Sequence, residues 1–336
     1  MHILVATDAW HPQVNGVVRT LTAVAAAAER LSARVTFLTP EGMPSAPLPT
    51  YPSIRLAMPN PWSIARQIEE AQPDAIHIAT EGPIGHCVRR YCLRRGIPFT
   101  TSFHTRFPDY VAARLPVPKG LIWAWLRRFH NAAATIMAAT PTLARELSRR
   151  GFRNVAQWSR GVDSSLFRPR DGADLGLSRP VFLSVGRISI EKNIGEFLAL
   201  DLPGSKVVVG DGPLRADLAR QFPEVLFLDA RDGEELAAIY AAADVFVFPS
   251  RTDTYGLVLL EALASGVPVA AFPVRGPRDV IGRRPVGALD ADLRLACLRA
   301  LTLSRAACRE YALSLSWEMS ARRFIANVVR ATRATV

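Results

Sequence analysis

Two acidic residues, Asp253 and Glu261, are the side chains whose types and spacing most suggest chemistry. An apolar segment at residues 257–263 is expected to form a helix. Asp253 lies four residues before this segment, and Glu261 lies inside it. A carboxylate buried without a partner in such a helix costs on the order of several kcal/mol. The spacing therefore indicates either two functional carboxylates or a partly exposed glutamate beside an unrelated loop aspartate.

The sequence around the two acids predicts a strand, a helix and a second strand. Residues 244–249 and 267–272 are apolar and form the predicted strands. Thr254 is suited to the N-cap of the helix, Gly266 to its C′ position, and Pro268 to ending it. The N–H groups at the start of a helix, together with the helix dipole, favour a phosphate. We expect this end of the helix to be formed by Thr254, Tyr255, Gly256 and Leu257.

Two cations, Arg187 and Lys192, follow a further predicted strand at residues 181–185. Arginine offers a planar fork to phosphate oxygens, and lysine offers a compact point charge. With a helix N-terminus they could hold a diphosphate without metal, and the sequence has no DxD motif and no His/Cys cluster of ligand spacing. Because Glu261 could accept hydrogen bonds from a ribose and Asp253 from a sugar, the set predicts a site for a nucleotide diphosphate sugar. The alternative is that Arg187 and Lys192 are an ordinary pair of surface residues, since two basic residues at this spacing are common on protein surfaces.

The first residues have the pattern of a βαβ unit. Apolar runs at residues 2–7 and 34–39 predict strands, and an alanine-rich run at 17–31 predicts the helix between them. Gly16 stands at the entrance of this helix, where it would let a phosphate or a sugar approach the backbone. The alternative is a glycine needed only for the turn, and there is no GxGxxG fingerprint.

Four more strands are predicted in the first half, and they complete an open parallel sheet with helices on both faces. They lie at residues 54–57, 74–79, 98–103 and 135–139. Ligands of such sheets bind beyond the carboxyl ends of the strands. His104 follows residues 98–103 directly and is expected to face the cleft, although a lone histidine is usually structural. His77 lies inside a strand and is expected to be a core histidine.

The second half repeats this pattern, with strands expected at residues 181–185, 206–209, 225–228, 245–248 and 267–272 and helices beyond residue 290. The length of 336 residues accommodates two domains. The predicted fold is α/β, with two doubly wound parallel-sheet (Rossmann-like) domains facing a central cleft. We expect domains at residues 1–165 and 166–315 and a final helix at 316–336. The polar linker between the domains, rich in Pro and Gly, is expected at residues 160–163, 167–169 and 171–179.

The composition is that of a globular protein, with 49% hydrophobic and 21% charged residues. No apolar run reaches the roughly 18 residues of a spanning helix, and the apolar run at residues 2–7 is too short for a signal peptide, so we expect neither. The four cysteines have no CxxC spacing, so we expect reduced thiols and a cytoplasmic location.

The net charge of +11 favours anionic partners. Dispersed basic residues without a binding motif do not favour nucleic acid. Residues 119–130 predict an amphipathic helix in which Trp123, Trp125 and Phe129 are interleaved with basic residues. Such a helix suits the interface of an anionic membrane. Packing of its aromatics on the core is the interpretation that we favour.

Seven short motifs, in order along nearly the whole chain, resemble glycosyltransferase family 4 of the two-domain GT-B fold. They are Pro-Gln-Val-Asn-Gly-Val at 12–17, Ser-Phe-His-Thr at 102–105, Arg-Gly-Val-Asp at 160–163, Gly-Arg-(x)3-Glu-Lys-Asn at 186–193, Gly-Asp-Gly-Pro at 210–213, Phe-Pro-Ser at 248–250, and Asp-(x)7-Glu-Ala at 253–262. The resemblance implies a retaining transferase that uses a nucleotide sugar and needs no metal or other cofactor. It also implies that the first domain is on the acceptor side and that the final helix crosses back to it.

The resemblance also implies roles for the matching residues. Arg187 and Lys192 would bind the diphosphate, Glu261 the ribose and Asp253 the donor sugar. His104 would lie near the sugar and the acceptor. Gly16 would allow close approach of the first-domain loop.

One position departs from the pattern of the family, which usually has Glu where this chain has Asp253. The carboxylate is kept but shortened by one methylene, which puts the sugar contact in question. The Thr-Asp-Thr-aromatic-Gly form resembles a subset that includes bacterial mannosyltransferases and sulfoquinovosyl- or glycosyl-diacylglycerol synthases. No protein nucleophile or general base is assigned, because the route implied is front-face attack with the leaving phosphate taking the acceptor proton.

The predicted activity is transfer of a hexosyl unit to a hydroxyl of a lipid or a glycan. Mannose from GDP-mannose is the first choice of donor, and a UDP-hexose is the second. Two alternatives are a nucleotide-sugar epimerase of the same fold, which would need no acceptor, and a basic nucleic-acid-binding protein.

Overall fold

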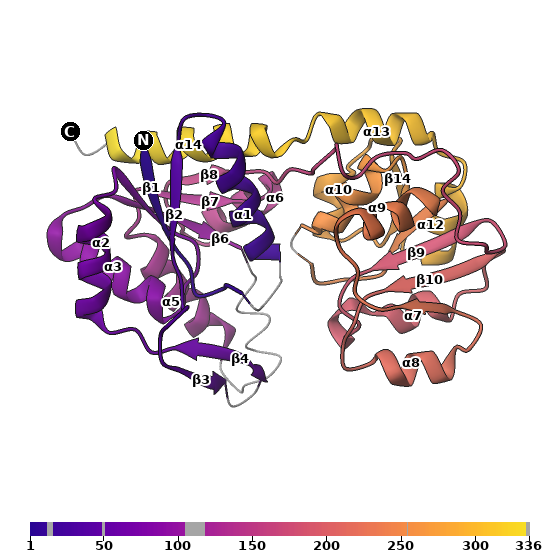
Figure 1. Cartoon of the computed structure of the whole chain (residues 1–336), viewed down its shortest axis with the longest axis horizontal. Helices are drawn as coiled ribbons and strands as arrows, with labels where there is room; N and C mark the ends of the chain where they lie inside the picture. The colour runs from indigo at the N-terminus through magenta and orange to yellow at the C-terminus, as the bar shows by residue number, and fades with distance from the viewer. Residues whose placement is uncertain (12–15, 49–50, 105–117, 254, 334–336) are drawn as a thin grey trace. The chain divides into compact units, whose positions relative to one another are not determined.

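The chain folds into two units. The computed structural model describes residues 1–11, 16–48, 51–104, 118–253 and 255–333 (Figure 1). Contacts divide the chain into one unit of Met1–Arg160 with Trp317–Val336 and a second of Gly161–Ser316. The first unit ends before the boundary expected at residue 165 because Val162 already pairs within the second unit. It forms a bridge with Ser316, and its N–H donates to the carbonyl oxygen of Leu315 at 2.9 Å.

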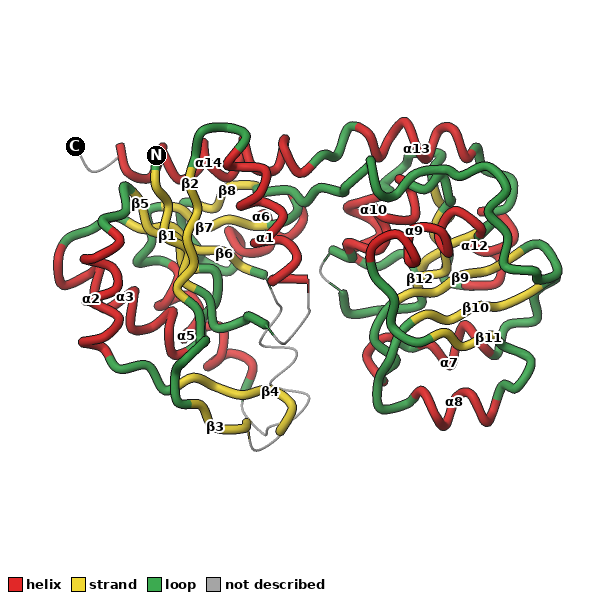
Figure 2. The backbone as a smooth tube through the Cα atoms, in the orientation of Figure 1, coloured by secondary structure: helices red, strands yellow, loops and turns green. Residues whose placement is uncertain are grey.

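A six-stranded parallel sheet forms the centre of the first unit, and its strands are drawn in yellow in Figure 2. The strand order of this sheet is β2-β1-β5-β6-β7-β8. Its strands are β1 (His2–Ala6), β2 (Arg34–Leu38), β5 (Ala75–Ile78), β6 (Phe99–Phe103), β7 (Thr135–Ala138) and β8 (Val155–Gln157). The first five agree with prediction to within one residue at each end. The sequence did not indicate β8, which has three residues, none of them fully buried.

The strand expected at residues 54–57 lies outside this sheet, and its assignment to the parallel sheet is wrong. It belongs to β4 (Tyr51–Ala57), which pairs antiparallel with β3 (Ser45–Leu48) in a separate two-stranded sheet. Only residues 49–50 separate the two strands. Parallel partners need a crossover of a dozen or more residues, so a connection this short dictates an antiparallel pair.

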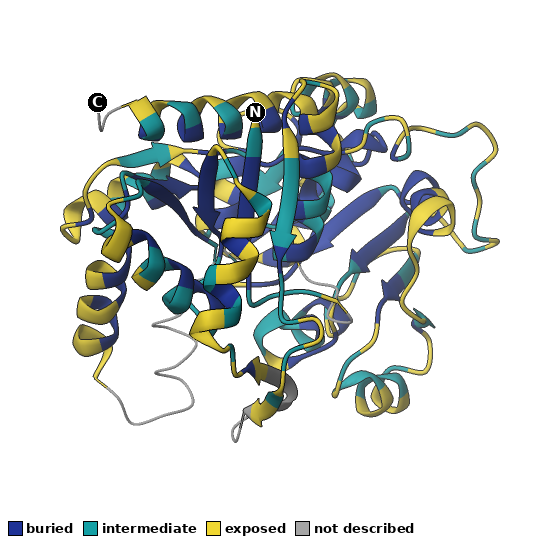
Figure 3. Ribbon diagram, turned by 60° about the vertical axis from the view of Figure 1, so that its left-hand side comes forward, coloured by how far each residue is buried: buried dark blue, intermediate teal, exposed yellow. Residues whose placement is uncertain are grey.

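Helices cover both faces of the first sheet, and alternate residues of β1 point to opposite faces. Ile3 and Val5 pack against α1 (Gly16–Glu29) and α14 (Trp317–Arg333). Leu4 and Ala6 lie on the other face, which is covered by α2 (Pro61–Ala71), α3 (Pro83–Arg95) and α5 (Lys119–His130). Helix α6 (Pro141–Arg149) packs on β7 and β8. Figure 3 shows buried and exposed residues alternating along α14, as expected for a helix with one face on the core.

The last helix, α14, is joined to the first unit by hydrogen bonds as well as by packing. The indole N–H of Trp158 donates to Ser320 Oγ at 3.1 Å, and Ser320 Oγ donates to the carbonyl oxygen of Ser159 at 2.7 Å. Phe324 lies against the same indole, with ring centroids 4.9 Å apart. Because Trp158 and Phe324 are almost fully buried, these contacts fix the helix on the sheet.

The second unit is built in the same way. Its parallel sheet has the order β11-β10-β9-β12-β13-β14. The strands are β9 (Val181–Val185), β10 (Ser205–Val209), β11 (Leu226–Leu228), β12 (Val245–Phe248), β13 (Val269–Ala271) and β14 (Gly287–Leu289). The five predicted strands are confirmed, whereas the sequence did not indicate the short, half-buried β14.

Helices also cover both faces of the second sheet. One face carries α9 (Gly233–Ala242), α10 (Leu257–Ala264) and α13 (Arg305–Leu313), and the other carries α7 (Ile194–Leu198) and α12 (Leu293–Ala300). Helices α8 (Arg215–Gln221) and α11 (Arg275–Val280) follow β10 and β13. The expectation that the chain is mainly helical beyond residue 290 is confirmed by α12, α13 and α14. None of the described helices has both the length and the apolar character needed to cross a membrane.

Candidate active site

The start of α10 differs from the prediction. Thr254, expected at the N-cap, lies outside the described residues, and the N-cap is Gly256, with φ of 82° and no side-chain cap. Gly256 also sits against Phe248 and Leu259, which would lie 3.1 and 3.2 Å from an added Cβ. Glycine is therefore required here both by its backbone conformation and by close packing. Leu257 is the first helical residue, and Tyr255 packs against the core of the second unit.

The end of α10 agrees with the prediction. Gly266 has φ of 72°, the left-handed conformation typical of the C′ position. Its N–H donates to the carbonyl oxygen of Leu263 at 3.0 Å.

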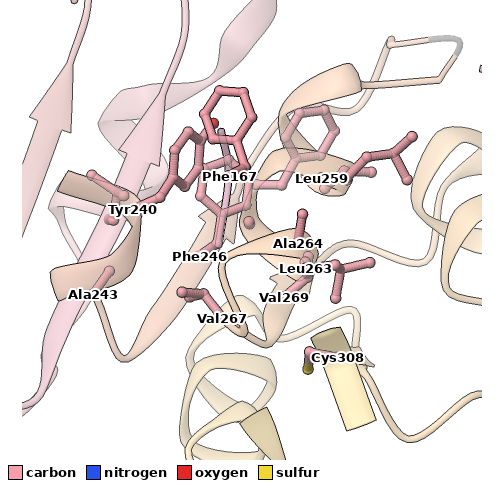
Figure 4. Packing of buried hydrophobic residues seen from close by; sticks show 14 of the residues in the cluster. Phe167, Tyr240, Ala243, Phe246, Leu259, Leu263, Ala264, Val267, Val269 and Cys308 are labelled. Carbon is pink, nitrogen blue, oxygen red and sulfur yellow. The ribbon is translucent and has the colours of Figure 1, made fainter. Parts of the chain in front are cut away.

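Glu261 is buried and hydrogen-bonded inside α10. Only 7% of it is exposed, and its Oε2 accepts a hydrogen bond from the hydroxyl of Tyr240 at 3.0 Å. Tyr240 comes from α9 and packs between Phe167 and Phe246, each with its ring centroid 5.6 Å away (Figure 4). The alternative of a partly exposed glutamate is therefore wrong. A buried carboxylate held in one orientation by a tyrosine suits a binding role.

Lys192 and Asp253 form an ion pair at the carboxyl ends of β9 and β12. The lysine Nζ donates to Oδ1 at 2.7 Å and to Oδ2 at 2.8 Å. Both side chains are partly open, with 28% and 25% exposed. Arg187 lies two residues after the end of β9 and is exposed. The structure thus joins the candidate diphosphate lysine directly to the candidate sugar carboxylate.

The loop that carries Lys192 is attached to the loop that follows β12. The carbonyl oxygen of Glu191 accepts hydrogen bonds from Ser250 Oγ and Thr252 Oγ1, both at 3.3 Å. Asn193 adopts a left-handed conformation, and its amide donates to the carbonyl oxygen of Pro249 at 3.2 Å. These contacts give the motifs at 186–193 and 248–250 a shared structural purpose, since they place Lys192 beside Asp253.

The loop after β10 packs backbone to backbone against the same region. The N–H of Ile188 donates to the carbonyl oxygen of Asp211 at 2.9 Å. A Cβ at Gly210 would lie 2.0 Å from the carbonyl oxygen of Gly186, and one at Gly212 would lie 2.3 Å from that of Ile188. The glycines at 210 and 212 are therefore required by this close approach.

In the first unit, Gly16 and His104 follow the carboxyl ends of β1 and β6. Gly16 opens α1, and an added Cβ there would meet no heavy atom of the described chain within 4 Å. Residues 12–15 and Thr105, which belong to the motifs around them, lie outside the described residues. His104 is partly buried, and its Nδ1 lies 3.0 Å from a guanidinium nitrogen of Arg160. Burial first, then the positive charge of Arg160 and the nearby His77 and His130, hold the pKa of His104 well below its usual range.

His77 is a core histidine, as predicted. It is fully buried, with Nδ1 at 2.8 Å from Thr100 Oγ1 and Nε2 at 2.8 Å from Ser102 Oγ. Burial, with a smaller contribution from Arg160, lowers the pKa of His77 to about 3. This residue belongs to the packing of the sheet.

The aromatic residues of α5 are divided between core and surface. Trp123 and Phe129 are buried, which confirms the favoured interpretation for both. Trp125 is 39% exposed and Leu121 is 65% exposed. Contact of this edge with a membrane stays a prediction.

Two partners of the candidate site were missed by sequence reasoning. Tyr240 lies on a different helix from Glu261, and no spacing or motif connects them. Arg160 belongs to the quoted motif at 160–163, which was interpreted only as the linker and as part of the resemblance. That motif was the available signal for Arg160. Within the described residues, no cluster of three or more His, Cys, Asp or Glu residues is placed to hold a metal ion.

Two parallel-sheet units with polar loops at the carboxyl ends of their strands define the two-domain GT-B fold. The structure is similar to that of sucrose-phosphate synthase from Thermosynechococcus elongatus, with a TM-score of 0.79, 20% identity and full coverage of both chains. Family models described as Glycosyltransferase Family 4 and Glycosyl transferases group 1 match residues 14–166 and 179–294.

The chain belongs to glycosyltransferase family 4. It is 30% identical to the GDP-mannose-dependent alpha-mannosyltransferase of Mycolicibacterium smegmatis over 86% of this chain and 84% of the relative. It is 29% identical to the protein of that name in Mycobacterium tuberculosis, over 86% of this chain and 83% of the relative. The protein is therefore an enzyme of the hexosyltransferase type. These comparisons do not support the epimerase alternative.

Proposed function

We propose that this enzyme is a retaining, metal-independent transferase that moves a mannosyl unit from GDP-mannose to a hydroxyl of a lipid or glycan. A UDP-hexose is the second choice of donor. The observation that carries the proposal is the Lys192–Asp253 ion pair, together with the buried carboxylate of Glu261 in α10, the helix that follows Asp253 in the chain. The choice of mannose follows the names of the two relatives, both GDP-mannose-dependent.

Each group of the second unit has a role in holding the donor. Glu261 accepts hydrogen bonds from the ribose hydroxyls, and Tyr240 keeps its carboxylate oriented. Arg187 and Lys192 bind the diphosphate, aided by the N–H groups of Tyr255, Gly256 and Leu257. Asp253 accepts hydrogen bonds from the transferred sugar.

The ion pair must open when the donor binds. The diphosphate carries more negative charge than Asp253 and replaces it at the ammonium of Lys192. The carboxylate that is released then faces the sugar. Binding of the donor thus exchanges one ionic contact for another, which keeps the cost of desolvating Lys192 small.

Transfer itself breaks the bond from the anomeric carbon to the diphosphate oxygen and forms a bond from that carbon to the acceptor oxygen. Negative charge grows on the leaving diphosphate, and Arg187, Lys192 and the α10 N-terminus stabilise it. The proton of the acceptor hydroxyl passes to the leaving phosphate. Attack from the face that the leaving group vacates retains the anomeric configuration, and no side chain becomes covalently bound.

The first unit contributes Gly16 and His104 on the acceptor side. Because the described chain leaves open space around Gly16, a substrate can approach its backbone closely. The proposed location is the cytoplasm, at the inner face of the membrane, where the exposed Trp125 and Leu121 and the net charge of +11 favour an anionic surface. No nucleic-acid partner is proposed.

The proposal is tested by titrating the protein with a panel of nucleoside diphosphate sugars and then assaying the bound donors with a lipid extract. We expect GDP-mannose to bind best, the product to keep the α configuration by NMR, and a chelator to leave the rate unchanged. An isomerised nucleotide sugar formed without any acceptor would contradict transfer. An inverted product or a loss of activity with chelator would contradict the mechanism.

A further inference from the structure

A buried arginine holds the histidine at the carboxyl end of β6. One terminal nitrogen of Arg160 lies 3.0 Å from Nδ1 of His104, and the other donates to the carbonyl oxygen of Trp158 at 3.0 Å. The guanidinium carbon lies 4.6 Å from the centre of the Trp158 ring, and only 5% of Arg160 is exposed. These contacts fix which nitrogen of His104 the guanidinium faces.

The chemistry of the guanidinium decides the tautomer of His104. Arginine has five N–H donors and no acceptor, so Nδ1 of His104 must accept the hydrogen bond. A ring nitrogen that accepts carries no proton, and the neutral imidazole then carries its proton on Nε2. If His104 were an imidazolium, its Nδ1–H would point at an N–H of Arg160, so two donors would face each other. The positive ring would also be repelled by the positive guanidinium.

The groups around His104 also oppose a positive charge. The ionisable side chains that act on it are Arg160, which follows β8, His77 from β5 and His130 from α5. The carboxylate of Glu81 lies 3.0 Å from Nε2 of His130. Burial is the largest influence and, with these neighbours, holds the pKa of His104 well below its usual range.

We propose that Arg160 is a positioning residue that fixes His104 as the neutral tautomer with its proton on Nε2, so that His104 donates a hydrogen bond to an oxygen of the bound sugar. The donor role rests on the proposed function and on the family resemblance, which implies that His104 lies near the sugar and the acceptor. Nδ1 of His104 accepts the hydrogen bond from Arg160, and Nε2 already carries a proton. The ring therefore has no nitrogen left that can take up a second proton. His104 therefore takes no proton from the acceptor hydroxyl.

The tautomer is tested without substrate, by NMR of the full chain carrying 15N-labelled histidine, between about pH 5 and about pH 8. The signals of His104 are identified by their loss in His104→Gln. We expect an unprotonated Nδ1, a proton-bearing Nε2 and no titration. A proton on Nδ1, or a midpoint near about 6.5, overturns the role of Arg160.

Variants of the arginine test its effect on the ring. Arg160→Gln offers an amide that can donate or accept, so the histidine is expected to populate both tautomers, with a pKa that is less depressed because one positive charge is gone while burial remains. Arg89→Gln is the matched control, because Arg89 donates to the main-chain carbonyls of Phe129 and Arg128 in the same unit. An unchanged His104 spectrum in Arg160→Gln refutes the proposal, and this result does not depend on any assay of transfer.

The donor role is tested by kinetics. Glutamine places its amide nitrogen near the position of Nε2, and asparagine places it near that of Nδ1. We expect His104→Gln to keep about tenfold more kcat/KM than His104→Asn, the difference of one hydrogen bond in the transition state. The reverse order, or near-wild-type rates in both variants, overturns the donor role and the place of His104 at the sugar. The NMR result still judges Arg160 on its own.

Discussion

At the scale of single residues, the candidate site contains two kinds of charged group, an ion pair between two side chains and a buried carboxylate. Lys192 and Asp253 form a partly exposed pair, whereas Glu261 is buried and held by Tyr240. A partly exposed ion pair adds little stability. Its position at the carboxyl ends of β9 and β12 is therefore better explained by substrate binding than by folding.

Replacing Lys192 by alanine is expected to lower kcat by about 100-fold or more while leaving the unfolding free energy almost unchanged. The reason is the loss of a cation that stabilises the leaving diphosphate. Arg179→Ala is the matched control, because Arg179 pairs with Asp244 at the amino ends of the same two strands. Steady-state rates with GDP-mannose and urea unfolding measure both effects. A near-normal rate for Lys192→Ala would remove this residue from the diphosphate site.

Tyr240→Phe is expected to weaken nucleotide binding about tenfold, because the Glu261 carboxylate loses the hydrogen bond that orients it. Tyr311→Phe removes a similar bond, from its hydroxyl to the carbonyl oxygen of Val280 at 2.7 Å, on α13 of the same unit. Calorimetric titration with GDP compares the two variants. Equal affinities would show that Tyr240 supports the fold and not the ribose contact.

The sequence indicates the charged residues of the candidate site but not the side chains that hold them in place. Arg187, Lys192, Asp253 and Glu261 stand in motifs or at predicted strand ends, which are visible along the chain. The partners of Glu261 and His104 are Tyr240 and Arg160, and each reaches its site from a distant part of the sequence. Such contacts follow from tertiary packing, and neither spacing nor periodicity along the sequence shows them.

At the scale of elements, buried strands were predicted well and marginal ones poorly. An apolar run such as Val181–Val185 predicts its strand directly because four of its five residues are fully buried. β8 and β14 have three residues each and no fully buried one, so they lack that signal. The N-cap of α10 was missed because Gly256 acts through backbone conformation and close packing, whereas a capping rule looks for a side-chain oxygen.

Gly210→Ala tests the close contact between the loops after β9 and β10. The added methyl would overlap the carbonyl oxygen of Gly186, and φ of 145° is already strained for alanine. We expect a loss of about 3 kcal/mol or more of stability and a large loss of activity, because the loop of Lys192 must shift.

Gly172→Ala serves as the comparison for this variant. Gly172 has φ of 70° but nothing within 4 Å of an added Cβ in the described chain. Its alanine variant is expected to lose only about 1 kcal/mol, from backbone strain alone. Urea unfolding and transfer rates of the two variants separate overlap from strain, and similar losses in both would exclude the contact as the cause.

At the scale of the whole molecule, the two units differ in their titratable and fluorescent residues. All six histidines and all six tryptophans of the sequence lie in Met1–Arg160 or Trp317–Val336. The second unit, Gly161–Ser316, has none of either. Protonation of histidine therefore acts on the first unit alone, and tryptophan fluorescence follows the unfolding of that unit without a label.

The stability of the first unit should fall as the pH drops below about 6.5, the ordinary pKa of histidine. Burial lowers the pKa of His77 to about 3, and the pKa of His104 also lies well below its usual range. Above about pH 6.5 neither ring binds a proton in the native or the unfolded chain. Below it only the unfolded chain takes up these protons, so each histidine lowers the unfolding free energy by about 1.4 kcal/mol per pH unit. Tryptophan fluorescence in urea, between about pH 6.5 and about pH 5, measures this slope.

His77→Gln isolates the contribution of one of these protons. This variant is expected to be less stable at every pH, because Thr100 and Ser102 lose their ring partner. Its pH slope should nevertheless be smaller by about 1.4 kcal/mol per pH unit, since one uptake site is gone from the unfolded chain.

Val88→Ala, a cavity variant on the other face of the sheet, should lose stability and keep the full slope. The Asp8 carboxyl, whose pKa is raised by burial, acts in the opposite sense and is common to all three proteins. The test is therefore the difference between the two variants in the pH slope of their unfolding free energy. Equal slopes in His77→Gln and Val88→Ala would show that His77 is not neutral in the native fold.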